Sequence, residues 1–468
     1  MGIREEQSDL ATWIETTTGG AIVSSERQGR WRVHWMVDVD TPTGRLKLLA
    51  RMPRDPEYIE YMAFLRSYRP LHEAKVLQAL EPTAIPTTRF YGFHTPTQTL
   101  LIERLDGSGD FRDLDVAAAE VVLLKYVEQM VAIHALPVEV FANAALPTPD
   151  PTRPGGQLQW MRQDFDNARP HIRPEPLLEL GLWWLDHHLP ADQNRRSIVQ
   201  GDTGPGQFMF DGTELLALID WELADIDHPM LDLGVMRMRN TLYPMGSLDR
   251  ALERYSELSG RPLDLEAIRY FTVLASLVSL LGMAQSMQAP SAAIDSMLPR
   301  LAWDVVMRRC LCEALLEAAA ITPRPPELPE PLTTSRASLH SFLVEHLEVG
   351  CASLASDDYG RYLLGGAVGL ARALQHLDQV GPALDEADLD DIEVVLGARP
   401  SSLADGNEQL AHIVATDPAA RLPELLQMWY RIARRREFGW RPLMVAQGAG
   451  PLIPMRNDLG QRPPALTG

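Results

Sequence analysis

The sequence predicts an α+β protein in two lobes, a small antiparallel sheet and a larger helical region, followed by an all-α C-terminal domain. Three observations carry this prediction. Residues from about 9 to 103 alternate between apolar and polar positions, as half-buried strands do. Residues 116–134 and several later segments repeat apolar side chains at helical spacing. A proline-rich stretch at 321–331 then separates this helical region from further helical segments.

The chain is longer than one hydrophobic core usually fills, so we expect several domains among its 468 residues. The predicted parts are an N-terminal lobe at 1–105, a C-terminal lobe at 106–320, a proline-rich linker at 321–334, a helical domain at 335–455 and a tail at 456–468. We expect the chain beyond Pro451 to be loosely ordered.

Composition excludes several classes of function. A net charge of −20 argues against a nucleic-acid surface, which needs clustered Lys and Arg. The cysteines Cys310 and Cys312 would point to different faces of a helix, so we expect reduced thiols rather than a disulfide or metal pair. The N-terminus lacks a signal-peptide core, and the most apolar run, 270–283, is too short to span a bilayer. We therefore expect a cytoplasmic protein without a membrane partner.

Within the N-terminal lobe, strands are predicted near residues 19–23, 31–37, 46–51, 88–93 and 99–107. Residues 71–80 lie between the third and fourth of these strands and have the periodicity of an amphipathic helix.

The stretch 197–233 contains the candidate catalytic residues. A short strand leads into a Gly/Pro-rich turn with Asp202, and Asp211-Gly212 is a strong hairpin signal between two apolar runs. The second strand of this hairpin delivers Asp220, so both acids should reach the same end of a small sheet, with the amide of Gln207 between them. An acid that accepts a hydroxyl proton, a second acid and an amide able to hold a metal ion are the parts used in phosphoryl transfer.

This stretch resembles the catalytic segment of the aminoglycoside phosphotransferase/choline kinase-like family, whose fold is that of the protein kinases. The matching residues are Gln200-Gly201-Asp202, Gln207, Ile219-Asp220-Trp221-Glu222, Pro229 and Asp232-Leu233. The family has His where this chain has Gln200, and Asn where it has Gln207. Residues 184–190 have the pattern Trp-Leu-x-x-His-x-Pro. This pattern resembles that of a bacterial branch of the family which is often described beside acyl-CoA dehydrogenases.

The resemblance implies a role for each of these side chains. Asp202 orients the acceptor hydroxyl and takes its proton, while Asp220 and Gln207 bind Mg²⁺. Gln200 and Asp232 support the catalytic loop, Asp232 by hydrogen bonds to its backbone. Glu222 is either a neighbour of the metal or half of a surface salt bridge, and His134 is either a catalytic base or, with better odds, a structural residue.

The resemblance also places the nucleotide in the N-terminal lobe. Arg51, preferred over Lys47, contacts the phosphates and is fixed by Glu73, and the backbone of Glu103 to Leu105 binds the adenine edge. The segment 24–30, with Ser24 and Ser25, is the candidate phosphate-covering loop. An ordinary exposed turn explains that segment as well, and both cations could be solvated strand charges.

The implied function is an ATP-dependent phosphotransferase, with GTP left open, that moves the γ-phosphate to a hydroxyl of a small molecule. A hydroxyacyl-CoA and an aminoglycoside-type alcohol are the candidate acceptors. The alternative is a pseudokinase or nucleotide-binding scaffold, weakened because Gln207 replaces Asn, and a non-kinase hydrolase is a third reading. The C-terminal helices could serve a protein partner or self-association. Their basic cluster, Arg431 and Arg434–Arg436, is either a phosphate-binding patch or a solvated helix end.

Overall fold

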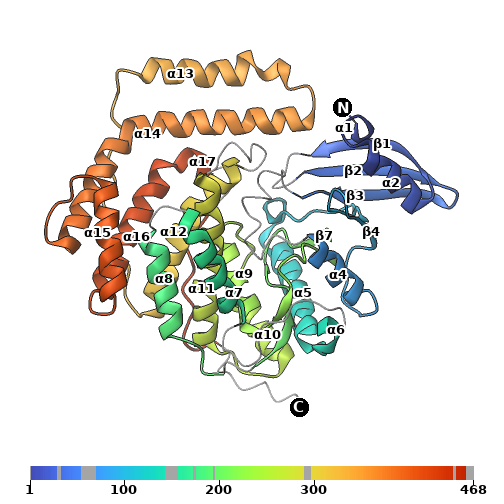
Figure 1. Cartoon of the computed structure of the whole chain (residues 1–468), viewed down its shortest axis with the longest axis horizontal. Coiled ribbons are helices and arrows are strands. Elements are labelled where there is room, and N and C mark those ends of the chain that lie inside the picture. The colour runs from blue at the N-terminus through green and yellow to red at the C-terminus, as the bar shows by residue number, and fades with distance from the viewer. Residues whose placement is uncertain are drawn as a thin grey trace.

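A computed structural model of the chain describes residues 2–28, 33–53, 70–142, 156–171, 175–192, 195–288, 297–445 and 449–459. The small lobe is built on one five-stranded antiparallel sheet in the order β1-β2-β3-β5-β4 (Figure 1). Its strands are β1 (Ala21–Gln28), β2 (His34–Thr41), β3 (Gly44–Arg51), β4 (Phe90–His94) and β5 (Thr99–Glu103). The predicted strands are therefore present, with their ends shifted by a few residues.

The N-terminal end of this lobe is helical, where alternation had predicted sheet from about residue 9. After the short helix α1 (Ile3–Glu6), helix α2 (Ser8–Thr18) presents Leu10, Ala11 and Ile14 as an apolar stripe at helical spacing. This stripe buries one face of the sheet, including Trp35 and Ala50. The helix stops at a glycine that adopts a left-handed backbone conformation.

Helix α4 (Pro70–Leu80) packs against β4 and β5. Ala74, Leu77 and Leu80 on α4 join a core that continues into the large lobe. The helix is therefore the part of the small lobe that connects the sheet to the rest of the molecule.

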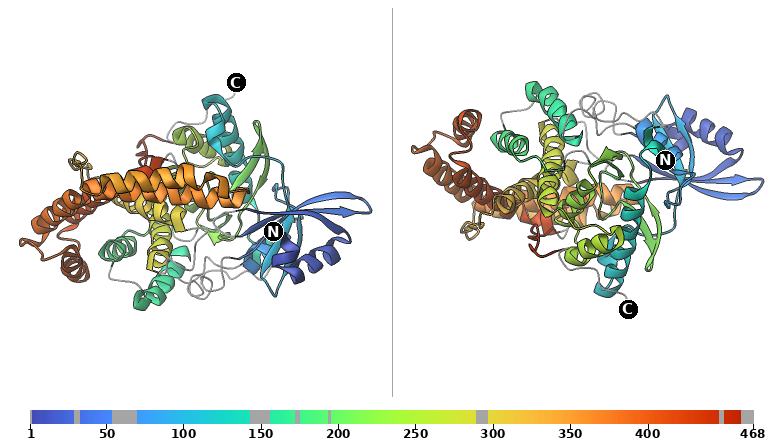
Figure 2. Two further views of the ribbon diagram at one scale, coloured as in Figure 1. Left: turned by 90° about the horizontal axis from the view of Figure 1, so that it is seen from above. Right: turned by 90° about the horizontal axis from the view of Figure 1, so that it is seen from below.

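The large lobe is a group of helices around a central, apolar α11 (Figures 1 and 2). Its helices are α5 (Val116–Ala135), α6 (Glu139–Ala142), α7 (Gly156–Ala168), α8 (Pro176–His187), α9 (Met230–Asn240), α10 (Leu248–Ser259), α11 (Leu265–Gln288) and α12 (Met297–Ala318). Ser247, Asp264 and Gly260 are of the residue types that begin and end helices, and they do so here: Ser247 accepts a hydrogen bond from Arg250 N, Asp264 accepts one from Ala267 N, and Gly260 ends α10.

Helix α11 is longer than the apolar run that the sequence indicates. Its stretch Leu265–Met283 is long and apolar enough to cross a membrane, but 67% of that window is buried inside the protein. Helices α8, α9 and α12 cover it, as expected for a core helix.

The C-terminal helices pack onto the same core rather than forming a core of their own. They are α13 (Ala337–Glu345, followed by a wider turn His346–Gly350), α14 (Asp358–Leu396), α15 (Leu403–Thr416), α16 (Leu422–Gly439) and α17 (Arg441–Val445). Helix α16 lies against α12 and α14, and its buried side chains belong to the large lobe's cluster. Helices α13 and α14 run side by side as a hairpin along one side of the molecule (Figure 1).

Residues 359–377 and 392–396, which have helical patterns in the sequence, both lie in α14, and this helix runs through Pro382 without a break. Val380 and Leu384 are buried on either side of this proline, so packing holds the helix together where one backbone hydrogen bond is lost.

The sequence predicts a loosely ordered chain beyond Pro451, but the structure is ordered as far as residue 459. Leu452, Met455 and Leu459 are buried, and the backbone N–H groups of Leu452 and Met455 donate to Glu313 and Glu317 on α12. Apolar side chains in this segment belong to the same core cluster as the large lobe. The segment 321–334 contains no helix or strand, and the Gln427 side chain bonds to the backbone of Thr322.

The basic cluster on α16 is not a free patch, and its members differ in exposure: the side chains of Arg431, Arg434 and Arg436 are 35–38% exposed. Arg435 is 1% exposed and bonds to Asp388 and Asp391 of α14. The other members form ion pairs too, Arg431 with Asp391, Arg434 with Glu437 and Arg436 with Asp304. Arg431 and Arg435 therefore join α16 to α14, and Arg436 joins it to α12, whereas Arg434 pairs within α16.

Candidate active site

Two small antiparallel sheets carry the candidate catalytic loop. Strand β6 (Ser197–Val199) pairs with β9 (Asp225–Asp227), and β7 (Phe208–Asp211) forms the predicted hairpin with β8 (Glu214–Leu218). The backbone N–H of Ile219 donates to the carbonyl oxygen of Gln207 at 2.9 Å. The loop that follows Asp202 therefore ends directly beside the residue that precedes Asp220.

Close backbone contacts force the loop into an unusual conformation. Gly201 has φ 82°, and a Cβ atom there would lie 2.2 Å from the carbonyl oxygen of Leu223. Asp220 itself has φ 61°, a left-handed conformation that costs a non-glycine residue about 1–2 kcal/mol. This strain lies at one of the two acids that the sequence assigns to the chemistry.

Asp232, at the start of α9, holds this loop in place. Its carboxylate accepts hydrogen bonds from the backbone N–H groups of Gln200 and Gly201 at 2.9 and 2.8 Å. These are the backbone hydrogen bonds expected of it. The Nε2 atom of His134 lies 3.0 Å from the same carboxylate, and its Nδ1 atom lies 2.7 Å from the hydroxyl of Tyr255. Both ring nitrogens of His134 therefore have protein partners, which is the arrangement of a structural residue.

Gln200 is fully buried, and both ends of its amide have partners. Tyr126 donates its hydroxyl to Oε1 at 2.8 Å, and Nε2 donates to the carbonyl oxygen of Ile219 at 2.9 Å. The glutamine therefore links the loop, α5 and the strand that leads to Asp220. Replacement of the family's histidine leaves no defect in this packing.

Both carboxylate oxygens of Asp202 accept hydrogen bonds. Arg239 of α9 donates Nη1 to Oδ1 at 2.7 Å, and Gln207 donates Nε2 to Oδ2 at 2.6 Å. Burial raises the pKa of Asp202 to about 6; the charge of Arg239 opposes this rise, while Asp220 and Glu222 add to it. Asp202 and Asp220 thus lie close enough to repel each other.

Arg51 joins the two lobes. Its guanidinium, 8% exposed, bonds to Glu73 of α4 and to Asp220, and lies 3.8 Å from Glu222. Burial alone would lower the pKa of Arg51, but the charges of Asp220, Glu73 and Glu222 outweigh it and raise that pKa. The competing cation, Lys47, is exposed and pairs with Asp106 instead.

The donor set suits a divalent cation with oxygen ligands. One carboxylate oxygen each from Glu73, Asp220 and Glu222 lies within 4.8 Å of the others. The amide oxygen Oε1 of Gln207 is buried and has no hydrogen-bond partner among the described residues. Four carboxylates, those three and Asp202, face two guanidinium groups, so the site carries an excess of two negative charges. An unpaired buried oxygen and excess negative charge are what Mg²⁺ compensates.

The structure places the remaining predicted nucleotide contacts as follows. Ser24 and Ser25 lie within strand β1 rather than in a loop, which corrects the expected start of the loop; residues 29–32 fall outside the described chain. The Ser24 hydroxyl donates to Asp38 at 3.0 Å, and the Ser25 hydroxyl accepts from Ile3 N at 3.0 Å. Strand β5 ends at Glu103, whose N–H is taken by the carbonyl oxygen of Arg89. Leu105 follows in an irregular segment between the lobes.

Sequence reasoning missed Arg239 and Tyr126. Every residue of α9 is buried, including Arg239, so a charged side chain there must have a partner. Two arginines, Arg237 and Arg239, in an otherwise apolar run directly after Asp232-Leu233 were the available signal. Tyr126 could not be told from the core residues of its apolar helix stripe.

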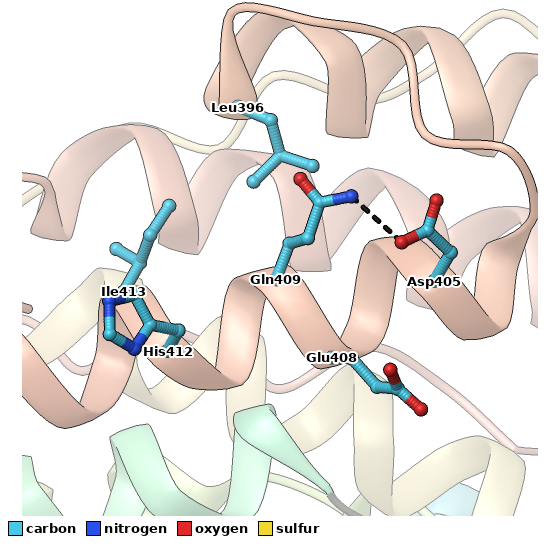
Figure 3. Close-up of a pocket in the computed structure, with 6 residues that line it drawn as sticks. All are labelled: Leu396, Asp405, Glu408, Gln409, His412 and Ile413. Atoms are coloured by element: carbon cyan, nitrogen blue, oxygen red, sulfur yellow. Dashed lines mark hydrogen bonds between the residues drawn. The ribbon is translucent and has the colours of Figure 1, made fainter.

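A separate surface hollow lies far from this site. It is lined by Leu396, Asp405, Glu408, Gln409, His412 and Ile413 (Figure 3). The hollow is on α15, at the opposite end of the molecule from β3 and α4 (Figures 1 and 2). Gln409 donates to Asp405 there at 2.9 Å, and none of the predicted site residues contributes to the lining.

Comparisons with known proteins find the following similar chains. Among solved structures, a macrolide 2′-phosphotransferase from Brachybacterium faecium is 19% identical, with a TM-score of 0.44, over 64% of this chain and 97% of that one. A choline kinase from Streptococcus pneumoniae is 14% identical, with a TM-score of 0.44, over 68% and 99%. Acyl-CoA dehydrogenase family member 11 from Gallus gallus is 37% identical over 77 residues, which are 16% of this chain and 10% of that protein.

The model of the phosphotransferase enzyme family matches residues 34–271, which are 238 of the 468 residues. This match runs from β2 into α11 and contains Arg51, Glu73, Asp202 and Asp220. The expected sheet-rich small lobe and helical large lobe are both present, and the helices after residue 335 are added to them. The chain belongs to the phosphotransferase enzyme family.

Proposed function

We propose that this protein is an ATP-dependent phosphotransferase that transfers the γ-phosphate to a hydroxyl group of a small molecule. One observation carries the proposal: Arg51, Glu73 and Asp220 converge from the sheet, α4 and the end of the β7–β8 hairpin. The unpaired oxygen of Gln207 belongs to the same hairpin. A basic residue fixed by a helix glutamate beside a metal-binding acid is the arrangement that protein kinases use for phosphoryl transfer, there with a lysine as the basic residue.

The nucleotide lies between the lobes in this proposal. Arg51 faces the phosphates, and the N–H of Leu105 donates to the adenine edge, because the N–H of Glu103 is already occupied by Arg89. Arg51 can leave Asp220 for a phosphate without losing its other partner, Glu73. The ion pair with Glu73 keeps the guanidinium in place during that exchange.

Asp220 and Gln207 hold Mg²⁺, and Glu222 is close enough to contribute. When bound, Mg²⁺ offsets the negative charge on the phosphate oxygens during transfer. Gln207 reaches one methylene further than the family's asparagine. Its N–H₂ group faces Asp202, which leaves Oε1 as the atom available to the cation.

Asp202 accepts the proton of the acceptor hydroxyl. The new bond forms between the acceptor oxygen and the γ-phosphorus, the bond from that phosphorus to the β–γ bridging oxygen breaks, and ADP leaves. Each oxygen of Asp202 accepts one hydrogen bond in the structure, so a second lone pair stays available for the hydroxyl. Because this transition state needs positioning more than a strong base, a carboxylate is sufficient.

We favour a hydroxyacyl-CoA over an aminoglycoside-type alcohol as acceptor. The support is the relative from Gallus gallus, which is 37% identical to this chain over 77 residues and is named for acyl-CoA dehydrogenases. A nucleotide-binding scaffold is the second candidate. The observation that favours it is Gln207, since the longer side chain changes the distance between loop and metal.

The test is a phosphotransfer screen on the whole chain. Release of ADP from ATP, or of GDP from GTP, is measured with Mg²⁺ or EDTA against panels of hydroxyacyl-CoAs and aminoglycosides. Asp220→Ala should abolish turnover, while Glu214→Ala, which alters an exposed acid of the strand leading to Asp220, should leave it unchanged. Nucleotide binding without transfer to any acceptor would favour the scaffold, and no nucleotide binding would refute both candidates.

A further inference from the structure

We propose that Arg239 is a positioning residue that fixes the carboxylate of Asp202 for the acceptor hydroxyl. This inference rests on the role proposed above for Asp202. The catalytic motif does not include Arg239, which lies 37 residues after Asp202, on the buried helix α9.

The guanidinium of Arg239 connects the Asp202 side chain to the backbone of its own loop. Nη1 donates to Oδ1 of Asp202 at 2.7 Å, and Nη2 donates to the carbonyl oxygen of Pro205 at 2.9 Å. Two donors on one rigid plane fix both the carboxylate and the turn that follows it. A lysine could not make both bonds in this geometry, because its ammonium group is a single point.

The stem of Arg239 is fixed as well. A Cβ atom on Gly204 would lie 2.9 Å from Cβ and 3.1 Å from Cδ of Arg239, so the loop backbone rests against the arginine stem. The guanidinium carbon lies 5.5 Å from the ring centre of Trp303 on α12, and Arg239 is 5% exposed. The loop, α9 and α12 thus surround one side chain, and that side chain ends at Asp202.

Arg239 acts through Asp202 rather than on the substrate. A guanidinium stays protonated throughout the physiological range, so it cannot exchange the hydroxyl proton. Its bond to Oδ1, together with the Gln207 bond to Oδ2, blocks rotation of the carboxylate. Loss of Arg239 would let this carboxylate rotate, which lowers the fraction of bound substrate in reactive geometry and hence kcat. It should change nucleotide affinity little, because Arg51, which is proposed to contact the phosphates, bonds to Glu73 and Asp220 and not to Arg239.

Arg237 on the same helix provides a matched control. It is 1% exposed and donates to Thr272 at 3.0 Å, to Glu317 at 2.7 Å and to the carbonyl oxygen of Ile453 at 3.0 Å. Its partners lie on α11, α12 and the C-terminal segment, away from Asp202. Removing either arginine leaves buried partners unpaired, so both changes should lower stability, but only one reaches the catalytic loop.

The experiment measures kcat, KM for ATP and thermal stability for Arg239→Met, Arg239→Lys, Arg239→Ala and Arg237→Met in the full chain. We expect kcat to fall roughly 100-fold in Arg239→Met, the scale of a small misplacement of a reacting group, with KM within about 3-fold. Arg239→Lys keeps the charge and should still lose most of kcat. Added guanidinium ion should restore part of the kcat of Arg239→Ala, and Arg237→Met should keep kcat within about 3-fold.

The outcomes separate this inference from the proposed function. A wild-type chain that transfers phosphate, combined with Arg239 variants of normal kcat, overturns the role of Arg239 alone. Equal losses of kcat in the Arg239 and Arg237 variants, with no rescue by guanidinium, show a purely structural residue and also overturn it. A wild-type chain that binds nucleotide but transfers nothing overturns the proposed function and this inference with it.

Discussion

Replacing Asp232 by asparagine tests how the catalytic loop is held. The carboxylate accepts from Gln200 N and from His134 Nε2 at Oδ2, and from Gly201 N at Oδ1. An amide of the same shape has one oxygen, so it can accept on one side only. Its N–H₂ group would then face the N–H of Gly201, donor against donor.

The magnitude follows from that loss. One hydrogen bond to a charged acceptor is worth about 1.5–3 kcal/mol, and leaving a buried N–H unpaired costs about 1–3 kcal/mol more. We therefore expect Asp232→Asn to lower the free energy of unfolding by about 3–5 kcal/mol, because Asp232 is fully buried. Turnover should fall as well, since the loop carrying Asp202 loses its anchor.

Urea denaturation followed by tryptophan fluorescence measures the change, with ADP release measured in parallel. Asp264→Asn is the control: it alters a helix cap, where asparagine is as good as aspartate, and should shift the free energy by less than about 0.5 kcal/mol. If Asp232→Asn stayed within about 1 kcal/mol of the wild type, with normal turnover, the loop would not depend on this carboxylate and the reasoning would be refuted.

Three further predictions concern single residues. Gly201→Ala should destabilise the protein by more than about 3 kcal/mol in urea denaturation, because the added Cβ would lie 2.2 Å from a backbone oxygen. Gly212→Ala is the control: it has open space around it and should cost about 1–2 kcal/mol for its positive φ. Equal effects of the two changes would contradict this. Burial lowers the pKa of His228 from 6.5 to about 4, so between these pH values the unfolded chain binds a proton that the folded chain does not. The contribution of the neutral His228 to the free energy of unfolding is therefore complete above pH 6.5, and it falls by about 3 kcal/mol as the pH drops to 4. His228→Gln should flatten that part of the urea midpoint against pH, and an unchanged slope would contradict this account of His228. Gln207→Asn restores the family's residue and should raise Mg²⁺-dependent ADP release if the site is an attenuated enzyme; no turnover before or after the change would indicate a scaffold.

Much of the site could be predicted because it is local in the sequence. The Asp211-Gly212 turn fixes the hairpin, and the hairpin fixes where Gln207 and Asp220 meet, so the spacing alone contained the geometry. Ser247 and Gly260 marked a helix by their own backbone preferences. In each case the determinant lies within a few residues of what it determines.

What could not be predicted depends on distant partners. Arg239 and Tyr126 matter because the fold brings them into hydrogen-bond contact with the catalytic loop. The sequence pattern does not indicate which distant residues will make that contact. Helix α14 continues through Pro382 because buried neighbours outweigh a local rule. Ser24 and Ser25 looked like turn residues, yet they extend a strand whose partner, β2, begins later than predicted.

Calorimetry of ATP binding tests the central claim most directly, namely that Asp220 and Gln207 hold a cation against nucleotide phosphates next to Arg51. The titration compares Mg²⁺ with EDTA for the wild type and for Asp220→Asn. We predict that Mg²⁺ tightens ATP binding at least about tenfold, which is about 1.4 kcal/mol, in the wild type and has no effect in the variant. ATP affinity that is the same with and without Mg²⁺ in the wild type would contradict the account.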